Sequence, residues 1–218
     1  MALAFALGFG SEVFFQCGQL EIMRQRVDAL IAHLSEHELA PFTRSRAKIL
    51  QGWLLTRQGA HDEGIGLVRE GLAIASATGN RLLLQNSHYM LARSYAEAGR
   101  AEEGLETLEE ALRNGEEIGE RSYEAELNRL TGELLLISDH GAQQAAEAYF
   151  RKTIDIAKGQ SAKSWELRAA TSLARLLRDT NRRDEARSML AEIYNWFTEG
   201  FDTADLKDAK ALLDELAG

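Results

Sequence analysis

The sequence predicts an all-α protein: a right-handed superhelical solenoid of five helical hairpins with a C-terminal capping helix. Three observations lead to this fold class. Residues 59–64 (GAHDEG) recur 40 residues later as residues 99–104 (GRAEEG). The 218 residues contain one proline and lack regularly spaced β-branched runs, which disfavours a turn-rich β-sandwich. Apolar residues make up 45% of the chain, enough to form a buried core.

Small residues recur at two fixed places in the repeat. Where two helices cross closely, a larger side chain would hold their backbones apart, so these positions mark the predicted crossings. Pro41 fits the first turn of a helix, where its missing N–H costs nothing. Gly99 and Gly119 are expected to end helices with a positive φ. The two small-residue series are Gly52, Ala92, Gly132 and Ala174, and Gly64, Gly104, Ala146 and Ala186.

The repeat divides the chain into successive helical elements. The predicted solenoid domain spans residues 1–200, with hairpins at about 2–38, 41–79, 81–119, 121–159 and 162–199. Residues 201–218 are the predicted capping helix, with Asp202 as N-cap and Asp205 three residues later. A helix with one apolar stripe at the end of a solenoid covers the exposed face of the last repeat. The predicted stripe is Leu206, Ala209, Leu213 and Leu216.

The third hairpin carries a recognisable pattern of small and aromatic residues: Leu91-Ala92, Tyr95, Gly99, Gly104, Leu108 and Ala111. This pattern resembles the tetratricopeptide repeat (TPR), whose common period is about 34 residues. The period of 40 or more in this chain implies helices that are longer by almost a turn.

A second resemblance covers three longer segments: residues 124–135 (EAELNRLTGELL), 162–176 (AKSWELRAATSLARL) and 194–206 (YNWFTEGFDTADL). They are similar to the C-terminal repeat region of large bacterial signalling proteins. In those proteins a nucleotide cyclase or DNA-binding module is followed by a predicted ATPase module and then by the solenoid. The resemblance implies a non-catalytic protein–protein interaction module of a bacterial signalling or regulatory system, whose partner is a protein or peptide.

The TPR resemblance also implies a binding groove, because the first helix of each TPR hairpin lines the concave surface. The lining positions lie six and three residues before the small residue and one and four after it, which keeps them on one helical face. Tryptophan, tyrosine and arginine are typical of binding hot spots, and arginine forks suit a carboxylate or phosphate. The candidate groove residues are Arg46, Trp53, Asn86, Tyr89, Arg93, Arg129, Glu133, Arg168, Arg175 and Arg178.

Two interpretations of this stripe stay open. The arginines either bind a partner, or Arg93 and Arg175 pair with the intervening Glu133 and connect neighbouring hairpins. Trp53 and Tyr89 are either exposed or partly buried by the solenoid itself. Arg178 is expected to be an unpaired cation, because no glutamate occupies the equivalent lining position of the other hairpins. The alternative function is a ligand-sensing arm that binds a small molecule or peptide in the groove.

Motifs for catalysis are weak, and the sequence predicts a protein that is not an enzyme and has no cofactor or metal site. The chain contains no Gly-Lys dipeptide and therefore no P-loop. Residues 33–37 (HLSEH) match the inverted zinc-protease signature, but a zinc site formed by His33 and His37 needs a third ligand that a repeat solenoid does not obviously supply. The net charge of −9 disfavours direct nucleic-acid binding.

The apolar N-terminal residues raise two further questions. Residues 1–15 lack the positive start and the cleavage site of a secretory signal and are too short to span a bilayer, so the sequence predicts a cytoplasmic protein without membrane association. Cys17 is expected to be a small buried hydrophobe. Phe5, Phe9, Phe14 and Phe15 cannot all face the second hairpin. Two interpretations stay open: structure upstream in a longer parent chain covers these rings, or a free chain covers them in a homodimer through the N-terminal apolar hairpin, which Phe9→Asp should dissociate.

Overall fold

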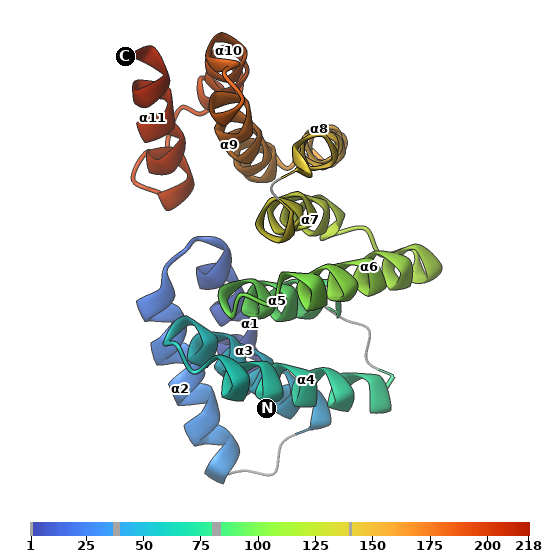
Figure 1. The fold of residues 1–218 in the computed structure, drawn as a ribbon. Helices are drawn as coiled ribbons and strands as arrows, with labels where there is room; N and C mark the ends of the chain where they lie inside the picture. The colour runs from blue at the N-terminus through green and yellow to red at the C-terminus, as the bar shows by residue number, and fades with distance from the viewer. Residues whose placement is uncertain (1, 37–39, 80–83, 140) are drawn as a thin grey trace. The chain divides into compact units, whose positions relative to one another are not determined.

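The computed structural model describes residues 2–36, 40–79, 84–139 and 141–218. These residues form eleven α-helices and no strand, in the order of five hairpins and a final helix, which confirms the predicted fold class (Figure 1). The helices are α1 (Ala2–Gln16), α2 (Leu20–Glu36), α3 (Pro41–Arg57), α4 (His61–Ala77), α5 (Leu84–Glu97), α6 (Ala101–Ile118), α7 (Glu124–Ser138), α8 (Gln143–Gly159), α9 (Lys163–Asp179), α10 (Arg183–Tyr194) and α11 (Ala204–Ala217). The predicted start of the third hairpin at Arg81 lies outside the described residues.

The chain forms two compact units, Met1–Ala111 and Leu112–Gly218. The division between them falls within α6, and each unit is a stack of helices with its own buried core. The organisation of residues 1–200 as a single solenoid domain stays a prediction.

Turns between helices repeat one backbone conformation. Gly99 and Gly119 both have a φ of +72°, as predicted for residues that end helices. Two turns reach the same left-handed region without glycine, at Ser161 (φ +57°) and Asn181 (φ +61°). A β-carbon makes this region unfavourable, although asparagine tolerates it better than serine does.

Ser161→Gly should therefore stabilise the protein by about 0.5–1 kcal/mol, because the left-handed turn no longer carries a β-carbon. Asn181→Gly is the matched control, and its effect should be smaller because asparagine already accepts this backbone. Urea unfolding of the two variants measures the difference. Equal effects of the two substitutions, or a loss of stability in Ser161→Gly, would contradict the argument.

In the first unit, helices α3 and α4 cross so closely that only glycine fits at the crossing. A β-carbon added at Gly52 would lie 2.5 Å from the carbonyl oxygen of Gly64 and 2.8 Å from the amide nitrogen of Val68. One added at Gly71 would lie 2.7 Å from the carbonyl oxygen of Ser45. These approaches confirm the predicted reason for the small residues of this hairpin.

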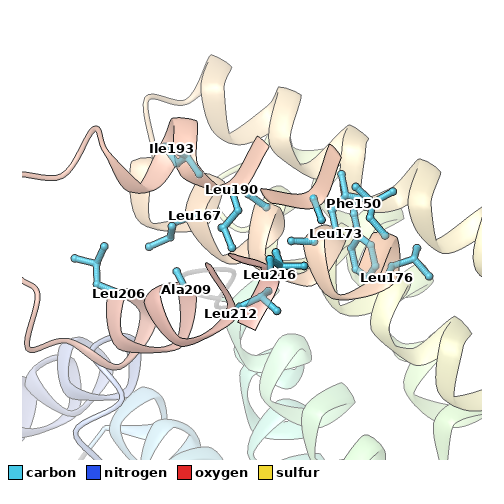
Figure 2. Packing of buried hydrophobic residues seen from close by; sticks show 14 of the residues in the cluster. Phe150, Leu167, Leu173, Leu176, Leu190, Ile193, Leu206, Ala209, Leu212 and Leu216 are labelled. Atoms are coloured by element: carbon cyan, nitrogen blue, oxygen red, sulfur yellow. The ribbon is translucent and has the colours of Figure 1, made fainter. Parts of the chain in front are cut away.

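The core of the second unit is formed by helices α8 to α11, and Figure 2 shows its side chains. Helix α11 closes this core with a buried apolar stripe: Leu206, Ala209, Leu212 and Leu216. The predicted stripe was wrong at one position, because Leu212 is buried and Leu213 only partly so. The predicted N-cap was also wrong. Thr203, not Asp202, precedes the helix in an extended conformation, and its hydroxyl donates to the carbonyl of Gly200 at 2.7 Å.

The first helix does not bury all of its apolar residues. Phe14 and Phe15 pack against the core of the first unit, whereas Phe5 is exposed. Cys17 is exposed as well, so the prediction of a buried cysteine was wrong: the residue lies in the turn that follows α1. None of the helices within the described ranges has both the length and the apolar character needed to cross a bilayer.

Candidate interaction surface

The predicted groove residues of the first unit are largely buried beneath α1. Trp53 on α3 is 5% exposed and Tyr89 on α5 is 6% exposed. The centre of the Phe15 ring of α1 lies 4.9 Å from the centre of the Trp53 ring, edge to face, and 6.2 Å from the centre of the Tyr89 ring. This trio joins three helices through their apolar faces. The alternative interpretation, in which the solenoid itself buries these two aromatic residues, therefore describes the structure.

Arg46 also contacts α1 rather than open solvent. Its guanidinium forms an ion pair with the carboxylate of Glu12 and lies 4.6 Å from the centre of the Phe9 ring. Burial raises the pKa of Glu12, and the attraction of Arg46 offsets only part of that rise. Arg46 thus holds α1 against α3. Arg93 is half-buried on α5.

Buried polar atoms without a hydrogen-bond partner among the described residues of these helices include Glu12 Oε1, Trp53 Nε1 and Asn86 Oδ1. Buried polar atoms in native proteins are nearly always hydrogen-bonded. The indole N–H can only donate and the two oxygens can accept, so each atom needs a partner of the complementary kind, such as a water molecule.

In the second unit, the corresponding residues of α7 form a charge network. Arg129 donates from Nε and Nη2 to the two carboxylate oxygens of Glu126, at 2.8 and 3.0 Å, and from Nη1 to Glu133. Ser172 of α9 donates to the same Glu133 at 3.0 Å. Glu126 is 1% exposed, and Arg168 of α9 approaches it to 3.5 Å. Buried ions of this kind depend on their partners to offset the loss of hydration.

Three arginines on α9, which we call the arginine row (Arg168, Arg175 and Arg178), each meet an acid from α11. Arg168 Nε donates to Asp205 at 2.8 Å, and Arg175 Nη2 donates to Asp208 at 2.5 Å. Arg178 pairs with Glu215 at 3.0 Å and with its neighbour Asp179 at 2.8 Å. The prediction that Arg178 is unpaired was therefore wrong. The final helix supplies an acid that the equivalent positions of the other hairpins lack.

The arginine row is partly accessible and stays charged. The side chain of Arg175 is 42% exposed and that of its partner Asp208 is 52% exposed. The hydrogen bond to Asp179, and then the charges of Asp179 and Glu215, raise the pKa of Arg178. Exposed ion pairs contribute only about 0–1 kcal/mol each, so another carboxylate can replace an α11 acid at low cost.

The proposed zinc ligands do not form a described site. His33 lies on α2, and His37 lies outside the described residues. In the ranges that the structure describes, no group of three His, Cys, Asp or Glu side chains is placed to hold a metal ion.

Sequence reasoning missed the partners that cover the predicted stripe. Glu12 and Phe15 of α1 lie over the second hairpin, and Asp205, Asp208 and Glu215 of α11 lie over the fifth. A signal was available for α11, because it takes the place of the next first helix in the repeat. Its acids follow the arginines they meet by 33 to 37 residues, near the repeat length.

Comparisons with known proteins agree with this architecture. A family model of the tetratricopeptide repeat matches residues 85–110 and 167–192. The comparison with curated proteins finds no match. Among solved structures, the apo form of RapI superposes with a TM-score of 0.65 at 16% identity, covering 100% of this chain and 84% of that chain.

Two further structures are similar at the level of the fold. BtubC from P. vanneervenii has a TM-score of 0.60 at 19% identity and covers 100% of this chain and 90% of its own. The TPR-like repeats of a putative kinesin light chain from Podosopora anserina have a TM-score of 0.57 at 16% identity, with coverages of 98% and 97%. Tetratricopeptide repeats are therefore detected in two segments of the chain, and its fold is that of a TPR-like solenoid.

Proposed function

We propose that the chain is a non-catalytic protein–protein interaction module of a bacterial signalling or regulatory system, and that it works in the cytoplasm. The TPR match and the resemblance of residues 124–135, 162–176 and 194–206 to the repeat region of such proteins support this proposal. Its partner is a protein or peptide segment rather than a nucleic acid.

The arginine row is the surface that we propose for the partner. Its three guanidiniums lie on one helix, and each is already matched to a carboxylate of α11. A partner segment rich in Asp or Glu can make the same hydrogen bonds by exchanging with those carboxylates. The exchange leaves α11 in place, because its buried leucines hold it to the core independently of the ion pairs.

The single observation that carries this assignment is the pairing of α9 arginines with α11 acids. A fluorescein-labelled oligoglutamate peptide tests it by fluorescence anisotropy with the full chain. We expect salt-sensitive binding, because the contacts are charge pairs. The chain's net charge of −9 repels such a peptide overall, so binding requires a local cationic site.

Two variants sharpen the test. Arg175→Gln should weaken binding about fivefold, the effect of one lost charge-assisted contact near the surface. Asp208→Asn should strengthen it, because it removes the internal competitor. Arg24→Gln on α2 is the control, since that exposed arginine also pairs with acids but lies outside the row. No binding by the wild type, or equal binding by Arg175→Gln, would refute the assignment.

A ligand-sensing arm is the second candidate function, and the three unpartnered polar atoms at Glu12, Trp53 and Asn86 favour it. A molecule that satisfies them binds the native state and raises the melting temperature. Stabilisation by a free amino acid that is lost in Asn86→Leu would favour this function over the scaffold.

Association of two copies through the N-terminal hairpin belongs to the same proposal. The surface for it lies on the first unit and shares no residue with the arginine row.

A further inference from the structure

The arginine row is matched by acids from one face of a single helix. The ion pairs run in the same order along α9 and α11: Arg168 with Asp205, Arg175 with Asp208, and Arg178 with Glu215. Each set spans ten residues, which is about 15 Å along a helix axis. At about 100° of rotation per residue, the three acids lie within an arc of about 80° around α11. One face of one helix therefore satisfies the whole row.

An extended segment does not reproduce this pattern. Asp205 and Asp208 are separated by about 4.5 Å along their helix, because they are three residues apart. In a strand, side chains alternate between two faces, and the nearest residues on one face are about 6.6 Å apart. An extended chain of ten residues also covers about 33 Å, roughly twice the length of the row. The spacing of the row thus suits a helix.

The middle of the row is its most accessible part. The side chain of Arg175 is 42% exposed, whereas those of Arg168 and Arg178 are 19% and 26% exposed. The acid that holds Arg175, Asp208, is itself 52% exposed. An acid that arrives from solvent therefore exchanges most easily at the middle position.

We propose that the segment bound by the arginine row is an acidic α-helix that repeats the acid spacing of α11. Its pattern is an Asp or Glu followed by two others, three and ten residues later. The middle acid of this helix takes the place of Asp208 on Arg175 through a charge-assisted hydrogen bond. The inference rests on the proposed function of the arginine row, and it adds the conformation and acid pattern of the partner.

Two fluorescein-labelled peptides of about 17 residues and equal composition test the proposal. Both are built from alanine and glutamine and carry three glutamates. In the first peptide the second and third glutamates follow the first by three and ten residues, and in the second peptide by five and ten. An offset of five turns the middle acid about 140° away from the first acid on a helix, whereas offsets of three and five share one face of a strand.

Fluorescence anisotropy with the full chain should show that the first peptide binds about fivefold more tightly, the effect of one charge-assisted contact near the surface. Arg175→Gln should bind the two peptides equally, because it removes the partner of the middle acid. Arg178→Gln is the matched control: it should weaken both peptides and keep the fivefold preference, since Arg178 meets the last acid. Far-UV circular dichroism checks that the two peptides are equally helical.

The outcomes separate this inference from the proposed function. If the wild type binds oligoglutamate but binds the two peptides equally, the helical pattern is overturned and the arginine row remains the binding surface. A preference that persists in Arg175→Gln, or that disappears in Arg178→Gln, would also overturn the pattern. If neither oligoglutamate nor the two peptides bind, the arginine row is not the partner surface and both proposals are wrong.

Discussion

Gly64→Val should destabilise the protein by about 3 kcal/mol or more. A β-carbon at Gly64 would lie 2.5 Å from the carbonyl oxygen of Gly52 and 2.8 Å from the amide nitrogen of Thr56. Both atoms belong to the backbone of α3 and cannot rotate away. The variant must therefore separate α3 from α4 and open the core that contains Leu50, Val68 and Leu72. Urea unfolding followed by tryptophan fluorescence, in a background in which Trp165 and Trp196 are replaced by phenylalanine so that Trp53 alone reports, measures this loss.

Gly66→Ala on the same helix is the control. An added β-carbon there meets nothing within 4 Å, and alanine favours a helix interior over glycine. This variant should be more stable than the wild type by about 0.5–1 kcal/mol. If the free energy of unfolding of Gly64→Val lies within about 0.5 kcal/mol of the wild-type value, α3 and α4 do not cross as closely as described.

Arg129→Met should cost the second unit about 3 kcal/mol of unfolding free energy. The change removes both hydrogen bonds to the buried carboxylate of Glu126 and the one to Glu133. Methionine fills much of the space, so the loss comes mainly from the charge left without its bidentate partner. Arg168, at 3.5 Å, is too far from Glu126 to replace that partner in full.

Two comparisons separate the buried ion pair from a general loss of charge. Arg175→Met removes an exposed pair with Asp208 and should change stability by less than about 1 kcal/mol. The double variant Arg129→Met/Glu126→Leu should recover part of the loss, because an apolar pair replaces the buried ions. If Arg129→Met alone is as stable as Arg175→Met, the buried network contributes little to stability.

The fold was accessible from the sequence because its signals are local. Residues 59–64 and their copy at 99–104, the small residues at Gly52 and Gly64, and the turn glycines each report on the nearest helices. A solenoid is built from contacts between neighbours, so such signals determine most of it. Cap positions were less accurate, as Thr203 in place of Asp202 shows, because the N-cap depends on the exact turn that precedes the helix.

The candidate site was less accessible because its residues were counted within one helix at a time. Trp53 is buried by Phe15 of the first hairpin, and Arg178 is paired with Glu215 of the final helix, so both partners come from another element of the fold. Whether a lining residue faces solvent depends on the side chains of adjacent first helices. A pattern of offsets within one helix carries no information on them.

The boundary between the two compact units has a practical consequence for dividing the protein. It falls between Ala111 and Leu112, in the interior of α6 (Ala101–Ile118). A fragment cut there would lose the backbone hydrogen bonds of about one turn on each side and would expose the apolar stripe of that helix at its new end. Fragments that end after Gly119 or begin before Ala101 keep α6 whole, so two fragments that both include this helix should yield more folded material than two that divide it.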